Sequence, residues 1–147
     1  MSIDDDVALF ECAPTLRLLG DAALRMLAIG SEQRDFLDGD ILFRQGDEAD
    51  AGFMVRRGAF RVQDSAGGEI IAGTGSLIGE LALVVPIKRP STATALERSS
   101  VIRIPRSLFQ RVLEADPAAA GRLRDEFATR SSQIAKDLQA ASAKLNL

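Results

Sequence analysis

The sequence predicts an α+β fold, in which helices at both ends of the chain flank an antiparallel β-roll. Two observations predict it. Apolar residues recur at helical spacing near both ends, whereas the middle consists of short apolar runs separated by Gly, Asp and Ser. The 147 residues, 46% of them hydrophobic and 27% charged, suffice for one globular domain with its own core. We therefore expect residues 1–147 to form a single domain.

Residues 1–34 are expected to form two or three short N-terminal helices. Apolar residues follow helical spacing from Val7 onwards, and Pro14 and Gly20 interrupt the pattern. The single cysteine of the chain, Cys12, lies in this segment. It cannot form an internal disulfide, and we expect it to be a small buried hydrophobic residue rather than a nucleophile.

Residues 35–104 carry the pattern of many short strands, which is typical of a roll or barrel. The turn-forming residues Asp64–Gly68 are expected to be a hairpin loop between two of them. The expected strands include Phe36–Leu37, Ile41–Phe43, Phe53–Val55, Phe60–Val62, Ile70–Ile71, Thr92–Leu96 and Val101–Ile104.

Residues 105–147 return to a helical pattern and are expected to form two C-terminal helices. Ser107 and Gln110 have the spacing of a capping box at the start of the first helix. Asp116 and Pro117 supply an N-cap and a first-turn proline for the second helix.

The second C-terminal helix should be too long for a small roll to cover. A helix from Pro117 to Lys144 would measure about 42 Å at 1.5 Å per residue. Its apolar residues form one stripe, which is Leu123, Phe127, Ile134, Leu138, Ala141 and Leu145. We expect the distal part of this stripe to form a lid over a ligand or a contact surface for another chain.

The charge and the absence of histidine argue against several classes of function. With 18 Lys and Arg against 21 Asp and Glu, the net charge of −3 lacks the basic surface of a nucleic-acid binder. Without histidine there is no Ser-His-Asp triad, Cys-His pair or imidazole metal site. Carboxylate-only catalysis stays open, but the acidic residues are scattered. We therefore expect no enzyme, no catalytic residue, no metal and no cofactor.

The chain is also expected to work in the cytoplasm without contacting a membrane or DNA. Its first residues are acidic where a signal peptide would be basic, and no apolar run approaches the length that spans a bilayer. The chain ends after the last expected helix, where we would expect a DNA-reading segment in a transcription factor.

The most informative motif is the segment Ile78–Leu83, followed by Arg89 ten residues after Gly79. Gly79 lacks a Cβ, so its backbone can lie against a ribose-phosphate. Glu80 can accept a hydrogen bond from a ribose 2′-OH. The apolar run behind it can form a helical turn whose first N–H groups attract an anionic phosphate. Arg89 adds a permanently charged guanidinium that matches two phosphate oxygens.

This motif resembles the phosphate-binding cassette of the cyclic nucleotide-binding domain. That family includes the regulatory subunits of cAMP-dependent kinase, gated ion channels and bacterial catabolite-type regulators. The resemblance extends over about residues 7–127, and Gly39, Gly46 and Gly58 fall where the β-roll turns of the family have glycines. It implies an eight-stranded, jelly-roll-like antiparallel β-roll that carries the cassette at residues 78–93.

The resemblance also implies a ligand and a mode of action. The ligand would be a cyclic mononucleotide, cAMP or cGMP, and the domain would be a sensor that signals through movement of its C-terminal helices. The implied ligand-binding residues are Gly79, Glu80, Leu81, Ala82, Arg89, Pro90, Ser91 and Thr92. Two other interpretations of this motif are an exposed Arg89 in a weak ion pair and a Glu80 that only complements the helix dipole.

The chain departs from the family pattern at Pro90, where relatives donate a backbone N–H to the phosphate. A hydrogen bond to a charged acceptor contributes about 1.5–3 kcal/mol, so affinity should fall about ten- to a hundredfold unless the Ser91 hydroxyl compensates. Relatives that prefer cGMP often carry threonine here, so we favour cAMP. The alternative is a degenerate relative that binds no nucleotide and serves as a protein–protein interaction module. In either case an unknown effector protein or a second copy of the chain would contact the C-terminal helix.

Overall fold

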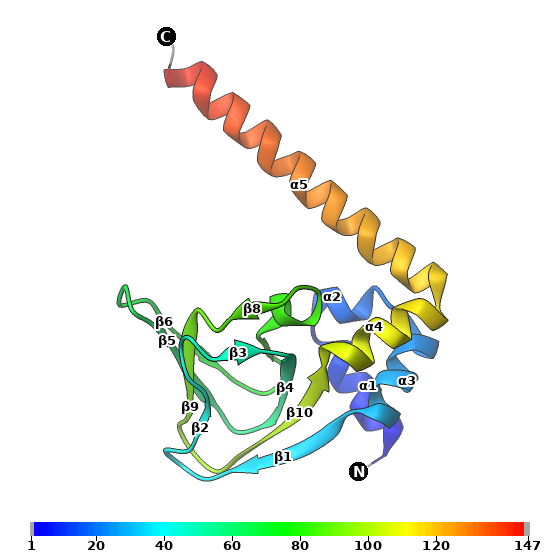
Figure 1. Ribbon diagram of the computed structural model, residues 1–147, viewed down its shortest axis with the longest axis vertical. Coiled ribbons are helices and arrows are strands. Elements are labelled where there is room, and N and C mark those ends of the chain that lie inside the picture. The colour runs from blue at the N-terminus through cyan, green and yellow to red at the C-terminus, as the bar shows by residue number, and fades with distance from the viewer. Residues whose placement is uncertain (1, 146–147) are drawn as a thin grey trace.

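The computed structural model describes residues 2–145 and confirms the α+β architecture. In chain order the elements are α1 (Ile3–Phe10), α2 (Pro14–Arg17), α3 (Asp21–Gly30), β1 (Glu32–Phe36), β2 (Ile41–Phe43), β3 (Glu48–Ala49), β4 (Ala51–Arg57), β5 (Phe60–Asp64), β6 (Glu69–Ala72), β7 (Leu77–Ile78), the 3₁₀ turn η1 (Glu80–Leu83), β8 (Ile87–Lys88), β9 (Ser91–Ala95), β10 (Ser99–Pro105), α4 (Arg106–Ala115) and α5 (Pro117–Leu145). Figure 1 shows the strands gathered into one roll, with the N-terminal helices and α4 packed together at one end of it.

The N-terminal segment forms three short helices, as its pattern predicts. Ser2 caps α1, because its hydroxyl accepts from the Asp5 N–H while the Asp5 carboxylate accepts from the Ser2 N–H. Pro14 begins α2, and Gly20, at φ 84°, separates α2 from α3. Cys12, between α1 and α2, is exposed, so the expectation that it is buried is wrong. It lies in a loop rather than on the apolar face of a helix.

Two four-stranded antiparallel sheets form the roll, in the orders β1-β10-β4-β7 and β2-β9-β5-β6. A two-stranded ladder joins β3 to β8. The described residues thus contain ten strands instead of the eight expected, and the predicted hairpin loop joins β5 to β6. Several strands have only two or three residues, too few for the alternation of a strand to be recognised in the sequence.

The roll begins three residues before its predicted start. The expected strand Phe36–Leu37 is in fact β1, Glu32–Phe36, an edge strand paired with β10 in the register Glu32↔Arg103 to Phe36↔Ser99. Four of its five side chains are polar and exposed, so it lacks the apolar alternation by which strands are recognised.

Two hydrophobic clusters hold the fold together. One lies among the N-terminal helices, α4 and the first turns of α5, and the other fills the roll. Successive residues of β4 contribute to different clusters: Met54 packs against the helices and Val55 into the roll. Because both faces of β4 are covered, the strand is buried almost throughout. Strand β7, which leads into the cassette, pairs with β4, so the cassette begins beside a strand that the two clusters share.

The C-terminal helices confirm one predicted cap and contradict the other. Asp116 caps α5, since its carboxylate accepts from the Ala119 N–H at 3.1 Å. The capping box at Ser107 is wrong, because β10 continues through Pro105 and α4 begins at Arg106 without a side-chain cap. Ser107 consequently lies inside the first turn of the helix and not before it.

Helix α5 has 29 residues, and those of its described side chains that pack in a hydrophobic cluster lie near its start. Leu123 is buried in the helical cluster and Phe127 packs against it, whereas residues 128–130 are exposed. Figure 1 shows the helix, coloured yellow to red, extending away from the other elements. The side chains of Ile134, Leu138, Ala141 and Leu145 lie outside the described part, so their predicted lid or contact role stays a prediction. No helix within residues 2–145 combines the length and apolar character needed to cross a bilayer.

Candidate ligand-binding site

The predicted helical turn follows Gly79 as a single 3₁₀ turn, η1. Gly79 has φ 76° and ψ 36°, a left-handed conformation that other residues adopt at a cost. The Ala82 N–H donates to the Gly79 carbonyl at 3.1 Å and makes the first bond of the turn. The N–H groups of Glu80 and Leu81 precede that bond, so the turn itself does not use them.

Arg89, between β8 and β9, is buried with only 4% of its surface exposed. Its Nη2 donates to the Ala51 carbonyl at 2.8 Å, while Nε and Nη1 have no partner among the described residues. The guanidinium carbon lies 4.3 Å from the centre of the Phe43 ring and 5.4 Å from that of Phe53. The interpretation of Arg89 as an exposed arginine in a weak ion pair is therefore wrong.

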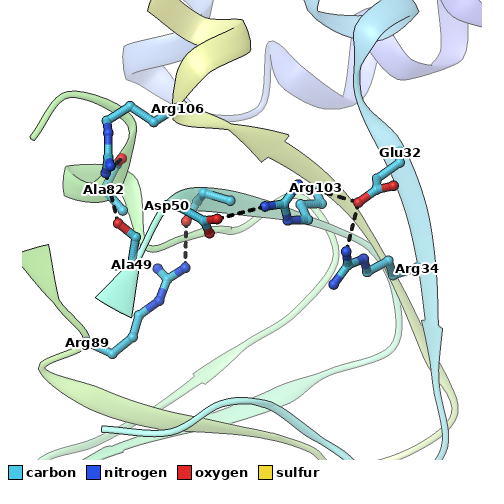
Figure 2. Close-up of polar contacts among 9 residues, drawn as sticks. Glu32, Arg34, Ala49, Asp50, Ala82, Arg89, Arg103 and Arg106 are labelled. Atoms are coloured by element: carbon cyan, nitrogen blue, oxygen red, sulfur yellow. Dashed lines mark hydrogen bonds and ion pairs between the residues drawn. The ribbon is translucent and has the colours of Figure 1, made fainter. Parts of the chain in front are cut away.

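The positive charge of Arg89 is poorly compensated by its surroundings. Burial lowers the pKa of Arg89, while Asp50 and Asp47 oppose that change and Arg103 adds to it. Figure 2 shows the reason: the Asp50 carboxylate faces Arg103, to which it is paired at 3.2 Å, and Arg103 also contacts Glu32. A buried and unpaired charge is unfavourable, so an anion that reached Nε and Nη1 would be bound strongly.

Gly79 and Arg89 are in close contact, and the contact requires glycine. A Cβ at position 79 would lie 2.5 Å from Arg89 Nη1 and 3.5 Å from the Ala51 carbonyl oxygen. The unpaired Nη1 is therefore next to the backbone of the turn. Only glycine provides both the left-handed conformation and the room that this arrangement needs.

Glu80 is half-buried and already has one partner. The hydroxyl of Thr15, a buried residue of α2, donates to Glu80 Oε1. The carboxylate keeps further acceptor capacity for a ligand hydroxyl. Thr15 could not be recognised from the sequence, because the two residues are 65 positions apart and no local pattern links them.

These residues border a cavity of about 530 Å³. Six of the eight predicted ligand residues line it, namely Gly79, Glu80, Leu81, Arg89, Pro90 and Ser91. Ala82 and Thr92 do not. Ala82, a residue of the turn itself, is fully buried, and the Thr92 hydroxyl accepts from the Gln45 N–H at 2.9 Å.

The rest of the wall is mostly apolar, and most of it lies outside the cassette predicted from the sequence. It includes Cys12–Thr15, Phe43, Val62, Ile70–Ala72, Gly75–Ile78 and Ile87. Ile70 and Ile71 of β6 are 65% and 56% exposed, although they are neighbours in a strand. These two adjacent isoleucines break the polar–apolar alternation of an exposed hairpin. This break is the sequence signal that could have identified the apolar wall.

Similarities to known proteins, in sequence and in structure, point to one domain family. Residues 33–116 match the family described as the cyclic nucleotide-binding domain. The N-terminal domain of a transcriptional regulator from Streptomyces coelicolor A3(2) has a TM-score of 0.78 at 26% identity, covering 88% of this chain and 94% of that one. A cyclic nucleotide-binding-like protein from Brucella abortus has a TM-score of 0.67 at 33% identity, covering 76% of this chain and 99% of that one.

A curated relative, lysophospholipase nte1 of Aspergillus fumigatus, is 32% identical over 109 residues. The match covers 71% of this chain but only 7% of that enzyme, so the enzyme's name describes a protein of which this chain resembles a small part. The family match, in contrast, spans more than half of this chain and contains every predicted ligand residue. This chain belongs to the cyclic nucleotide-binding domain family.

Proposed function

We propose that the domain is a sensor that binds a cyclic mononucleotide, cAMP in preference to cGMP, and performs no reaction on it. The observation that carries the proposal is Arg89, whose Nε and Nη1 are buried, without a partner among the described residues, in the wall of the cavity. A cyclic phosphate offers one negative charge and two free oxygens, which suit the planar guanidinium. Its entry would compensate the charge that the protein leaves unpaired.

The remaining parts of a nucleotide match the rest of the cavity. Glu80 retains acceptor capacity for the ribose 2′-OH, and the N–H groups of Glu80 and Leu81 lie beside Gly79, next to the expected phosphate. The exposed isoleucines of β6 offer an apolar surface for the purine. Pro90 also lines the cavity and has neither an N–H for the phosphate nor a hydroxyl for guanine, which favours cAMP.

The signal would leave through α4 and α5, which shift when the ligand orders the cassette. A ligand can move such an equilibrium only by its differential affinity for the two arrangements. The partner would be an effector protein or a second copy of the chain, contacted through α5 in the cytoplasm, with no role for DNA or a membrane.

A second candidate is a protein–protein interaction module that keeps the fold but binds no nucleotide. Pro90 favours it, since one phosphate donor of the family is missing. The Thr15 hydroxyl, which occupies Glu80 Oε1, favours it too. Arg89 argues against it, because an unpaired buried charge has no benefit for a protein without an anion.

Calorimetry with cAMP and cGMP tests the proposal, and Arg89→Met is the decisive variant. The parent protein should bind cAMP, and Arg89→Met should weaken binding about thirtyfold to several thousandfold, as the loss of one member of a desolvated charge pair does. Its melting temperature should stay the same or rise, because methionine packs well against Phe43 and Phe53 without a charge to desolvate. A parent protein that gives no heat with either nucleotide would exclude the sensor and leave the interaction module.

A further inference from the structure

Arg106, the first residue of α4, contacts three backbone carbonyls that do not belong to its own helix. Its Nη1 donates to the carbonyl oxygens of Ala49 at 2.8 Å, Ala82 at 3.2 Å and Val85 at 3.3 Å. Figure 2 shows its side chain reaching Ala82 and Ala49. One guanidinium thus connects the end of β3, the cassette turn and the start of the C-terminal helices.

Arg106 and Arg89 hold the same short stretch of backbone. Three successive carbonyls, those of Ala49, Asp50 and Ala51, accept in turn from Arg106 Nη1, from the Arg106 N–H at 2.7 Å and from Arg89 Nη2 at 2.8 Å. The Ala51 carbonyl fixes the orientation of the Arg89 guanidinium. A displacement of this segment would therefore move the two unpaired nitrogens of Arg89.

The other contacts of Arg106 lie at the carboxyl end of η1. Carbonyls at the end of a helical turn lack intrahelical donors, and a cation satisfies them well. Ala82 and Val85 are at this end, whereas Gly79 begins the turn beside the cavity. Arg106 consequently supports the cassette from the side opposite to the expected phosphate.

We propose that Arg106 is a positioning residue that keeps the cassette and Arg89 in their ligand-binding arrangement. The inference rests on the proposed function and extends it to a residue outside the cavity. Without the guanidinium, the three carbonyls lose a shared donor. The turn and residues 49–51 can then adopt conformations other than the one that binds the ligand. The ligand must then order them on binding, which lowers affinity.

Hydrogen exchange and calorimetry on Arg106→Gln, Arg106→Lys and Arg111→Gln test this role. Arg111 is an exposed arginine of the same helix, so its variant removes the same charge without the contacts. In the ligand-free protein, Arg106→Gln should speed exchange of the Ala82, Val84 and Val85 amides, which donate to carbonyls within the turn. It should also weaken cAMP binding about three- to thirtyfold, which is the size of effect seen when residues that couple two sites are mutated.

The other two variants should separate positioning from general charge effects. Arg106→Lys keeps the cation on a shorter side chain and should give intermediate exchange and affinity. Arg111→Gln should match the parent in both measurements. If Arg106→Gln does not fold, Arg106→Lys decides the matter, because parent values for both measurements in that variant contradict the proposal.

The outcomes distinguish this inference from the proposed function. If the parent binds cAMP and Arg106→Gln binds it within about twofold, the inference is wrong and the sensor stands. If Arg106→Gln exchanges like Arg111→Gln, Arg106 does not order the cassette, whatever the ligand. If the parent binds no nucleotide, the sensor fails together with the affinity effect, and the exchange comparison still decides whether Arg106 orders the turn.

Discussion

Arg89 and Gly79 depend on each other more closely than their spacing in the motif indicates. The spacing predicts that both face one ligand. The structure adds that Arg89 Nη1 occupies the space that a side chain at position 79 would need. Gly79 therefore has two separable roles: it adopts a left-handed backbone conformation, and it leaves room for Arg89. Gly39 shares only the first role and serves as a control.

Gly79→Ala should reduce cyclic nucleotide affinity strongly, whereas Gly39→Ala should not. Both glycines have left-handed φ angles, 76° and 89°, so alanine should cost each about 1–2 kcal/mol of stability. Only at position 79 does the added Cβ clash with Arg89, since nothing lies within 4 Å of a Cβ at position 39. Thermal unfolding should show similar losses, and calorimetry should show lost affinity in Gly79→Ala alone. Equal affinities in the two variants would mean that the contact with Arg89 does not matter for binding.

Pro90 should limit affinity, and replacing it should reveal the missing donor. The loop does not depend on proline alone, because the Arg89 N–H donates to the Asp47 carbonyl and the Arg89 carbonyl accepts from the Gly46 N–H, both at 2.8 Å. Pro90→Ala restores an N–H and should tighten cAMP binding several-fold, and Pro90→Thr should improve cGMP relative to cAMP. Calorimetry measures the dissociation constants of cAMP and cGMP for each variant. Weaker binding of both nucleotides in both variants would show instead that proline holds the loop in shape.

At the scale of elements, the cavity is built from segments far apart in the chain. The cassette turn supplies the polar wall, and β6 supplies much of the apolar one. Helix α2 joins the cassette through Thr15, and α4 joins it through Arg106. Each of these contacts links a helix to the cassette, so a change at the ligand can reach α2, which precedes the β-roll in the sequence, and α4, which follows it.

The isoleucines of β6 should contribute to affinity without contributing to stability. Ile70→Ser and Ile71→Ser should each weaken cAMP binding roughly tenfold, because a fully buried isoleucine contributes about 1.5–3 kcal/mol. Their melting temperatures should change little, since both side chains are largely exposed without ligand. Ile29→Ser, at a position that is 70% exposed and does not line the cavity, is the matched control. If all three variants bind alike, the purine does not lie against β6.

At the scale of the whole molecule, the folded body and the distal part of α5 are separable. Among the residues whose side chains the structure describes, the last one in either hydrophobic cluster is Phe127, and residues 128–130 are already exposed. The body should therefore fold without the distal helix. One experiment can show whether the distal helix is a lid over the ligand or an interface with another chain.

A protein truncated after Arg130 should keep its melting temperature, because Leu123 and Phe127 still anchor the helix. If the distal part is a lid, cAMP affinity should fall at least about tenfold, the contribution of one buried aliphatic side chain. If it is an interface, the mass in solution should decrease and the affinity should hold. Light scattering and calorimetry separate the two, and no change in either would identify a solvated tail.

The order of elements and the polar half of the site are properties of local sequence. Periodicity distinguishes the helical ends from the roll, and glycine at position 79 with Glu80 and Arg89 at set distances marks the cassette. These features depend on backbone freedom and on residues close in the chain, so they can be recognised without coordinates. The same local reasoning failed at Ser107 and at the polar strand β1, where pairing with distant strands determines the boundaries.

Only the tertiary structure decided how deeply Arg89 is buried and what surrounds it. Its burial depends on Phe43 and Phe53, its orientation on Ala51, and its lack of compensation on the pairing of Asp50 with Arg103. The apolar wall of β6 and the supports from Thr15 and Arg106 likewise bring together residues tens of positions apart. Desolvation and long-range contacts arise from packing between distant segments, and no local sequence pattern encodes them. The chemistry of the motif could therefore be predicted from the sequence, whereas the strength of its site depends on the tertiary structure.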